Sequence, residues 1–441
     1  MRIIPVQDNN FQHNICPALS VMFRCFVARK NDRDRLLLNV GSATIQRTKG
    51  ASIVSNNTSL FAQILKLIPR DQFNLIVRRH GGEKHAKGFT CYDQLVSMMF
   101  CQFTRVNSLR EINDGLRVTG GKLNHLGVKK AAPKSTLAYA NSHRPWKIYE
   151  DLFHVILSQS VAEASGKKRK FRFKNKLYSM DATIIDLCAA VFPWAHFRQT
   201  KGAVKLHMLL DHDGYLPSFA VITEGKQHEV TVAGDIPLPS GCIVAVDRGY
   251  CDYALYQKWT NEGVYFVTRQ KTNAAYRVIK SLDVSSNSKL ISDEHIVLTG
   301  PQSSVAYPGV LRRVCVRDEE RDCDFVLLTN KMDLVGNTIA QIYKDRWEIE
   351  LFFKCLKQNF KVKTFVGTTA NALKIQIWTA LITLLLIKLL QFRSKAHLPI
   401  CRLLSILRLN LFAYRDLNAW LEDPFDIPPD LPEPVQMVLT I

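Results

Sequence analysis

The chain has 441 residues, of which 47% are hydrophobic, a composition that excludes a disordered protein and allows about two or three folded domains. Its 59 Lys and Arg residues outnumber 39 Asp and Glu, and the formal charge of +20 favours a polyanionic partner, with nucleic acid first. The eleven cysteines show no CxxC or zinc-knuckle spacing, and no secretory signal is evident. We therefore expect reduced thiols in a cytoplasmic protein.

The N-terminal third divides into two parts. Residues 1–56 show no sustained hydrophobic period, and we interpret them as a disordered extension outside the working protein. Residues 57–165 predict an all-helical domain, with two short helices separated at Pro69, a helix over Tyr92–Phe103 and a capping box at Ser108–Glu111. Its basic residues are either a solvated surface or part of a DNA-binding module; they include Arg78, Arg79, Lys129, Lys130, Lys134 and Arg144.

A basic run, Lys167–Lys176, follows the helical domain and carries Phe171 and Phe173 between its cations. Two interpretations remain open for it. It is either a solvated linker at the entrance to a strand, or a ribbon that tracks phosphates.

From residue 176 to about 365 the pattern predicts an α/β core. The fully apolar run Cys242–Val246 is typical of a strand buried on both faces, and a helix and a strand after it complete a βαβ-like unit. Residues of about 275–320 predict a β-rich insertion of hairpins. Residues 366–441 predict a helical C-terminal region with a Pro-rich tail. The predicted strands are Tyr178–Cys188, Val204–Leu210, Ser218–Ile222, Cys242–Val246 and Val264–Arg269, with a helix at Tyr253–Glu262.

The most apolar stretch of the C-terminal region, Ile375–Ile387, lies between Lys374 and Lys388. It has about 13 residues, whereas a helix that crosses a membrane needs about 20. We therefore expect a buried core helix and no membrane partner.

The segment Gln341–Phe360 contains no Gly or Pro and predicts one continuous helix. At about 100° per residue, four of its side chains fall within roughly 60° of one another. These are Tyr343, Arg346, Glu350 and Lys357. The pattern indicates either an ordinary surface ladder of charges or a functional face.

Two aspartates precede this helix. Asp181 lies within an apolar strand, where a carboxylate is costly to bury unless it binds a cation, and Asp247 follows the buried strand at its carboxyl end. With Glu350 they would supply three oxygen ligands, which suits Mg²⁺. Two such ions, about 4 Å apart, could promote an in-line phosphodiester displacement. The histidines His207, His212 and His228 are expected to be core or turn residues rather than metal ligands.

The order of these residues, with Asp181 in MDATIID, Asp247 in DRGY and the spacing Tyr-x2-Arg-x3-Glu-x6-Lys, resembles the DDE transposases of the insertion-sequence-four family. The resemblance extends over roughly residues 57–395 and implies a ribonuclease H-like catalytic core with a β-rich insertion, preceded by an all-helical domain. It does not include residues 1–56.

The resemblance also implies specific roles. Asp181, Asp247 and Glu350 would be catalytic and would bind two Mg²⁺ ions, with Mn²⁺ able to substitute. Tyr343, Arg346 and Lys357 would contact phosphates of the transposon end, and we also expect DNA contact from Arg248 beside the second aspartate. The partners would be double-stranded DNA, namely the terminal inverted repeats of its own element and target DNA, and a second copy of the chain in a homodimeric synaptic complex. A bacterial, nucleoid-associated location follows.

Three functions are compatible with these residues. The first is an active transposase that cuts its own ends by metal-dependent cleavage and transfers the strands into target DNA. The second is a catalytically inactive DNA-binding relic of such an enzyme. The third is a plain nuclease, which would cut without preference for end sequences and without joining strands.

Overall fold

The computed structural model describes residues 58–425, except 85, 120, 166–169, 189–190, 193, 199–200, 285–288, 320–321 and 363. The predicted extension at 1–56 and most of the predicted Pro-rich tail lie outside the described residues.

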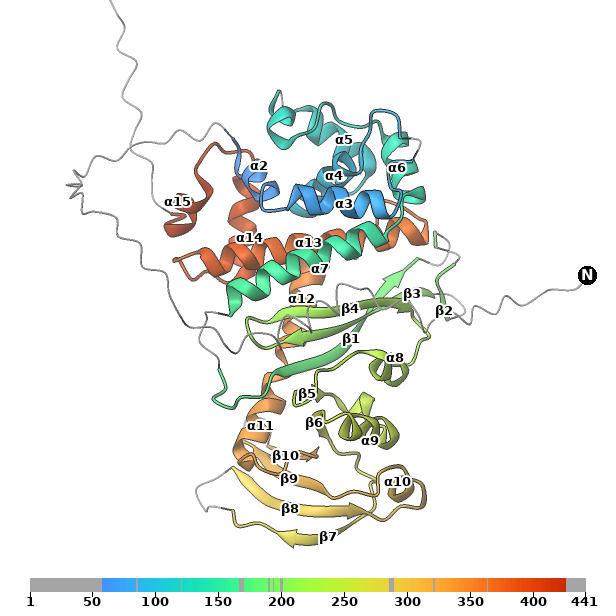
Figure 1. Ribbon diagram of the computed structural model, residues 1–441, viewed down its shortest axis with the longest axis vertical. Coiled ribbons are helices and arrows are strands. Elements are labelled where there is room, and N and C mark those ends of the chain that lie inside the picture. Colours follow the sequence, from blue (N-terminus) through green and yellow to red (C-terminus); the bar gives the residue numbers. More distant parts are fainter. Residues whose placement is uncertain are drawn as a thin grey trace, which may run out of the picture. The chain divides into compact units, whose positions relative to one another are not determined.

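A ten-stranded mixed sheet organises the described part of the chain (Figure 1). Its strand order is β2-β3-β1-β5-β6-β10-β9-β8-β7, and β4 pairs with β3 off this path. The strands are β1 (Leu177–Leu187), β2 (His196–Arg198), β3 (Lys201–Asp211), β4 (Leu216–Glu224), β5 (Ile243–Val246), β6 (Tyr265–Arg269), β7 (Tyr276–Ser281), β8 (Leu290–Leu298), β9 (Leu311–Asp318) and β10 (Cys323–Thr329).

Strand β1 joins two types of pairing. It is antiparallel to β3, which is antiparallel to β4, and it is parallel to β5, which is parallel to β6. The predicted βαβ unit is therefore present, with α9 (Tyr253–Asn261) between β5 and β6. The hairpins of the predicted insertion do not stand apart from this sheet, because β10 pairs with β6 and so extends the core sheet through β9, β8 and β7.

The two faces of the sheet are covered by different helices, because side chains alternate along each strand. On one face, Tyr178 and Met180 of β1 pack with α8 (Glu229–Asp235) and α9. On the other face, Leu177 packs with α11 (Gly336–Asp345). Odd-numbered residues of β1, which include Asp181, therefore face α11 and the helix that follows it.

The helices predicted on either side of the α/β core are present, and they share one hydrophobic core with β1 and β3. Figure 1 shows α7 lying alongside α13 in this layer. The remaining helices are α2 (Leu60–Leu65), α3 (Arg70–Arg79), α4 (Cys91–Thr104), α5 (Leu109–Arg117), the 3-10 helix η1 (Lys122–Leu126), α6 (Lys134–His143), α7 (Lys147–Ala164), α10 (Pro301–Ala306), α12 (Glu348–Asn359), α13 (Ala370–Arg393), α14 (Ile400–Leu409) and α15 (Leu417–Glu422).

Helix α13 contains the apolar stretch predicted as a core helix. It is the one described helix that is long and apolar enough to cross a membrane, yet 89% of its most apolar window is buried inside the protein. Its polar side chains are also used internally. Gln376, which is fully buried, donates to the carbonyls of Lys361 and Thr364 and accepts from the amide of Val366. These bonds attach residues 361–366, which follow α12, to helix α13.

Candidate active site

The two aspartates of the candidate site lie side by side at the same edge of adjacent parallel strands. Met180 of β1 is in register with Val246 of β5, so the next residues, Asp181 and Asp247, occupy equivalent positions on neighbouring strands. Neighbouring strands are about 4.8 Å apart, and residues in equivalent positions point to the same face. Thr183 and Ile185, which share the face of Asp181, are buried.

Each aspartate is oriented by a backbone amide. Asp181 Oδ1 accepts from the N–H of Ala182 at 2.7 Å, and Asp247 Oδ1 accepts from the N–H of Gly249 at 2.7 Å. Asp247 thereby caps the 3-10 helix η2 (Arg248–Tyr250). A side chain at Gly249 would bring its Cβ within 3.0 Å of Asp247 Oδ1 and 3.5 Å of Glu229 Oε2, so this close approach favours glycine.

Glu229, at the start of α8, is a further carboxylate beside Asp247 that the sequence interpretation missed. It also forms an ion pair with Lys205 of β3, at 3.2 Å. A lone Glu before a short helix carries no sequence signal, because its closeness to Asp247 depends on how α8 packs against η2.

The prediction of one continuous helix over Gln341–Phe360 is wrong. Helix α11 ends at Asp345 and α12 begins at Glu348, with a turn at Arg346 and Trp347. The Trp347 amide bonds three residues back, to Lys344 O at 3.3 Å, and the Arg346 amide is shared between Ile342 O at 3.2 Å and Tyr343 O at 3.3 Å. The turn contains no Gly or Pro, so tertiary contacts rather than local propensity account for it.

The turn directs Arg346 toward the carboxylates. Its Nη2 lies 2.7 Å from Glu350 Oε1 and its Nη1 lies 3.8 Å from Asp181 Oδ2. The guanidinium carbon lies 5.6 Å from the ring centroid of Tyr343. Arg346 is 8% exposed, and its Nε and Nη1 have no hydrogen-bond partner. Arg346 therefore acts as the counter-ion between the two carboxylates and keeps unused donors.

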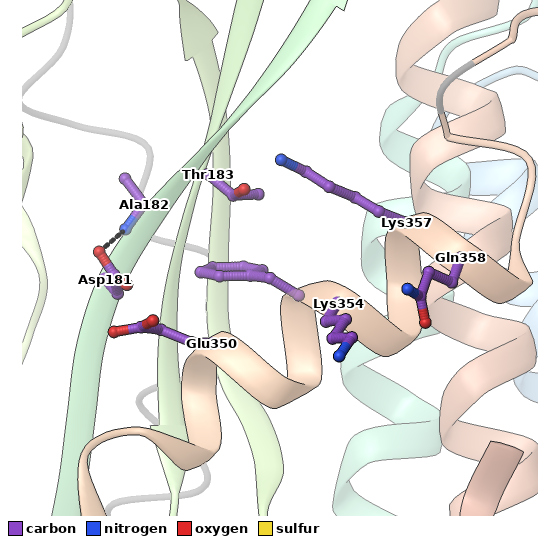
Figure 2. A pocket seen from close by; sticks show the side chains of 8 residues that line it. Asp181, Ala182, Thr183, Glu350, Lys354, Lys357 and Gln358 are labelled. Atoms are coloured by element: carbon purple, nitrogen blue, oxygen red, sulfur yellow. Dashed lines mark hydrogen bonds between the residues drawn. The ribbon is translucent and has the colours of Figure 1, made fainter.

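An open groove of about 410 Å³ runs beside this cluster, between β1 and α12. Figure 2 shows the carboxylates of Asp181 and Glu350 turned toward each other, with Lys357 reaching from α12 toward Thr183 of β1. Lys354 also lines the groove and is exposed. The structure thus brings Asp181, Glu350 and Lys357 together at one opening, as the sequence predicted.

The remaining predicted DNA contacts differ in their surroundings. Arg248 is exposed beside Asp247, whereas Tyr343 is partly buried. Burial raises the pKa of Tyr343, the Arg346 charge opposes this, and the Asp247 charge adds to it. Tyr343 therefore lies next to Arg346, and its hydroxyl is influenced by the charge of the second aspartate.

The electrostatics of Asp181 show how crowded the negative charges are. Burial raises the pKa of its carboxyl from 3.8 to about 7; the Ala182 amide and Arg346 oppose this, and the charges of Asp247 and Glu350 add to it. For Arg346, burial works against the charged form, but the contacts with Glu350, Tyr343 and Asp181 outweigh it and raise its pKa. The site is therefore short of positive charge.

Among the described residues, no three His, Cys, Asp or Glu side chains lie close enough to hold one metal ion together. Here Arg346 lies between Asp181 and Glu350 and offsets part of their negative charge. The donor set still fits a hard divalent cation, because it consists of carboxylate oxygens; burial raises the pKa of Asp181, and the charges of Asp247 and Glu350 add to this. The three histidines take other roles: His207 bonds Thr223, His212 bonds Ser179 and Asp345, and His228 precedes α8.

The basic run between the helical layer and β1 is partly used inside the protein. Lys170 pairs with Asp345, and Lys176 pairs with Asp211 at 3.0 Å and with Asp213 at 2.5 Å. In the described part of the run, its two phenylalanines stack on each other, with ring centroids 5.2 Å apart. Lys170 and Lys176 thus fasten the entrance of β1, which favours the linker interpretation for these two cations.

Comparison with known proteins gives two family matches. Residues 172–386 match the family described as "Transposase DDE domain", and residues 56–129 match "Domain of unknown function (DUF4372)". The first match contains all of the predicted site residues and the second covers much of the N-terminal helices.

Individual proteins are also similar to this chain in sequence or in structure. "Putative transposase y4zB" of Sinorhizobium fredii is 27% identical over 304 residues, which cover 68% of this chain and 83% of the relative. "Probable transposase for insertion sequence element IS5377" of Geobacillus stearothermophilus is 25% identical over 343 residues, or 78% and 87% of the two chains. Among solved structures, a piggyBac transposase synaptic complex with hairpin DNA aligns with a TM-score of 0.43 and 12% identity, over 86% of this chain and 87% of that one.

Proposed function

The chain belongs to the DDE transposases of the insertion-sequence-four family, and from this premise we propose that Asp181, Asp247 and Glu350 form its catalytic site. Its function is DNA transposition, and DNA is its partner. One observation carries the site assignment. The two aspartates are in register on adjacent parallel strands, on the face where α12 brings Glu350.

The proposed reaction is cleavage at the ends of its own element, followed by strand transfer into target DNA. The three carboxylates would hold two divalent ions, Mg²⁺ or Mn²⁺, which when bound activate the attacking water and stabilise the departing 3′ oxygen. The amides of Ala182 and Gly249 keep the aspartates oriented for this role.

The cations around the site, together with Tyr343, would bind the DNA backbone. Lys357 lines the groove, Arg248 is exposed beside Asp247, and Tyr343 adjoins Arg346. Arg346 has two donors without partners, so it could reach a phosphate oxygen when a divalent cation takes over its role as counter-ion. This proposal gives Arg346 one role in the free protein and another on DNA.

We further propose that β4, β3, β1, β5 and β6 form the ribonuclease H-like core, and that the helical segment 57–165 binds DNA. Three antiparallel strands joined to two parallel ones, with a carboxylate on each of the two central strands, support the first part. The net charge of +20 supports the second. Because two ends must be brought together, a homodimer would form the synaptic complex, in the bacterial cytoplasm at the nucleoid.

The test uses DNA that carries the inverted repeats flanking the gene, a target plasmid, and Mg²⁺ or Mn²⁺. The wild type should cut at the repeat boundary and join the ends to the plasmid, and Asp247→Asn should lose both products. Glu262→Gln, at an exposed carboxylate after α9, is the matched control and should retain both. Cuts without end preference or joining would indicate a plain nuclease, and binding without cuts in either metal would indicate an inactive relic.

A further inference from the structure

Three buried side chains form a continuous row next to the proposed site. His212, the residue after β3, lies with Nε2 2.7 Å from Ser179 Oγ of β1 and with Nδ1 2.7 Å from Asp345 Oδ2 at the end of α11. Since a carboxylate only accepts hydrogen bonds, Nδ1 is the donor in the second contact. The row therefore connects β1 to the last residue of α11 through one imidazole.

A Ser–His–Asp row resembles the arrangement that activates a serine nucleophile. Here the serine has no access to a substrate, because Ser179 is 0% exposed within the sheet. The side chains of His212 and Asp345 are 5% and 2% exposed. A hydrolytic role is therefore excluded by burial, and the row must serve the fold or the neighbouring site.

Asp345, the acidic end of the row, also forms hydrogen bonds and an ion pair with other residues. Asp345 also accepts a hydrogen bond from Tyr215 at 3.2 Å and pairs with Lys170 of the basic run. Burial acts to raise the pKa of Asp345, but the bonds and charges of His212 and Lys170 outweigh it and lower the pKa. The carboxylate is thus kept ionised and fixed at the point where α11 ends.

Both ends of the row are adjacent in sequence to the proposed site. Ser179 precedes Asp181 by two residues on the same strand and therefore on the same face. Asp345 directly precedes Arg346, and the turn that follows leads into α12 and Glu350. The row therefore spans the distance between β1 and the turn, beside the direct contact of Arg346 with Asp181.

We propose that His212 is a positioning residue, which joins Ser179 to Asp345 and thereby holds the α11–α12 turn at the distance from β1 that the three carboxylates require. This inference rests on the proposed function of the site. His212 touches neither DNA nor the reacting atoms, so its loss should affect the rate of cleavage rather than the affinity for DNA. Misplacement of catalytic groups by about 1 Å can lower a rate on the order of a hundredfold.

The experiment compares His212→Ala with His212→Asn, whose amide nitrogen can still donate to Asp345 in place of Nδ1. For His212→Ala we expect the cleavage rate at saturating end DNA to fall on the order of ten- to a hundredfold, with the dissociation constant for that DNA changed less than about twofold. His212→Asn should recover a large part of the rate. Hydrogen exchange of the amides in residues 341–350 should be faster in His212→Ala and near wild type in His212→Asn.

Asn141→Ala is the control for lost stability, because it removes a buried hydrogen bond within the helical layer, which Gln94 Nε2 donates to Asn141 Oδ1 at 2.7 Å. A loss of rate in His212→Ala no larger than in this control, or no rescue by His212→Asn, would overturn the inference. If the wild type does not cut end DNA, the proposed function fails, and hydrogen exchange still tests the role of His212. Unchanged exchange in His212→Ala would then refute the inference by itself.

Discussion

Arg346 is the residue whose surroundings most change the interpretation of the site. Its spacing alone suggests a DNA contact, but its guanidinium lies between Glu350 and Asp181 and is almost fully buried. A buried cation that lies between two carboxylates and retains unused donors is suited to exchange partners when another cation or a phosphate arrives.

For Arg346→Ala we expect weaker binding of end DNA, by roughly tenfold, because at least one charge-assisted hydrogen bond to phosphate is lost. The measurement is fluorescence anisotropy with a labelled end duplex, and cleavage is followed in parallel. Arg317→Ala removes one charge from the insertion, where Arg317 pairs with Asp324, and controls for net charge. Wild-type affinity and rate in Arg346→Ala would remove this residue from the site.

The raised pKa of Asp181 predicts a pH dependence of stability. In the unfolded chain an aspartate has a pKa of about 3.9, and in the folded protein burial raises it to about 7. Between these values the folded state binds the additional proton, so this group lowers the free energy of unfolding progressively as pH rises from about 4 to about 7. Above about pH 7 the carboxylate is ionised in both states, and the free energy of unfolding is lowered by the full amount.

Asp181→Asn should therefore raise the melting temperature of the metal-free protein at pH 8, by on the order of a few degrees, and have little effect at pH 4. Thermal unfolding with a chelator present measures this. Asp186→Asn, exposed on the opposite face of β1, is the matched control. An equal shift for Asp181→Asn at both pH values would show that its carboxyl does not titrate as the crowding implies.

At the scale of the residue, the strand pattern indicates Asp181 and Asp247, the helix pattern indicates Glu350, and the family resemblance indicates all three; Asp181 and Glu350 line one groove, and the catalytic roles of the three stay a prediction. The row Ser179–His212–Asp345 could not be predicted. Its members are separated by 33 and 133 positions in the sequence, and none has an unusual local pattern. Only the packing of α11 against the sheet brings them together.

At the scale of the element, the strands and most helices follow from hydrophobic period and capping. The helix start at Ser108 is confirmed, since Ser108 Oγ accepts from the Glu111 amide at 3.1 Å, but the Glu111 carboxylate accepts from the amide of Asn107 instead of that of Ser108, so only half of the predicted capping box forms. The prediction that fails is the single continuous helix over Gln341–Phe360. Arg346 and Trp347 keep right-handed helical backbone angles, and the interruption between α11 and α12 lies where Asp345 and Arg346 contact distant residues. Local propensity contains no information about such contacts.

Gln376 of α13 bonds to the segment that follows α12, and the loss of these bonds gives a prediction at the scale of the element. Gln376→Ala removes three hydrogen bonds, one to the buried Lys361 carbonyl and two to the partly buried Thr364 carbonyl and Val366 amide, so it should destabilise the protein by about 2–4 kcal/mol. Thr383→Ala removes one bond within the same helix, to Thr379, and should cost about 1 kcal/mol. Denaturant unfolding compares them, and equal losses would refute the fastening role.

At the scale of the whole described chain, the helices on either side of the α/β core form one layer with a common hydrophobic core. The sequence predicted two helical segments but not their association, because residues of α7 and α13 that touch are more than two hundred positions apart. This layer includes α12, so the helix that carries Glu350 and Lys357 is supported by both ends of the described chain.

The central claim is that Glu350, brought by α12 to the aspartates of β1 and β5, is essential for cutting transposon ends. The most direct test compares wild type, Glu350→Gln and Glu348→Gln on end DNA with Mg²⁺, measuring strand breaks at the repeat boundary and binding of the same DNA. Glu348 lies on the same helix, two residues earlier, and is the matched control. We predict cuts by the wild type and Glu348→Gln, and binding without cuts by Glu350→Gln. Cutting by Glu350→Gln at the wild-type rate would contradict the account.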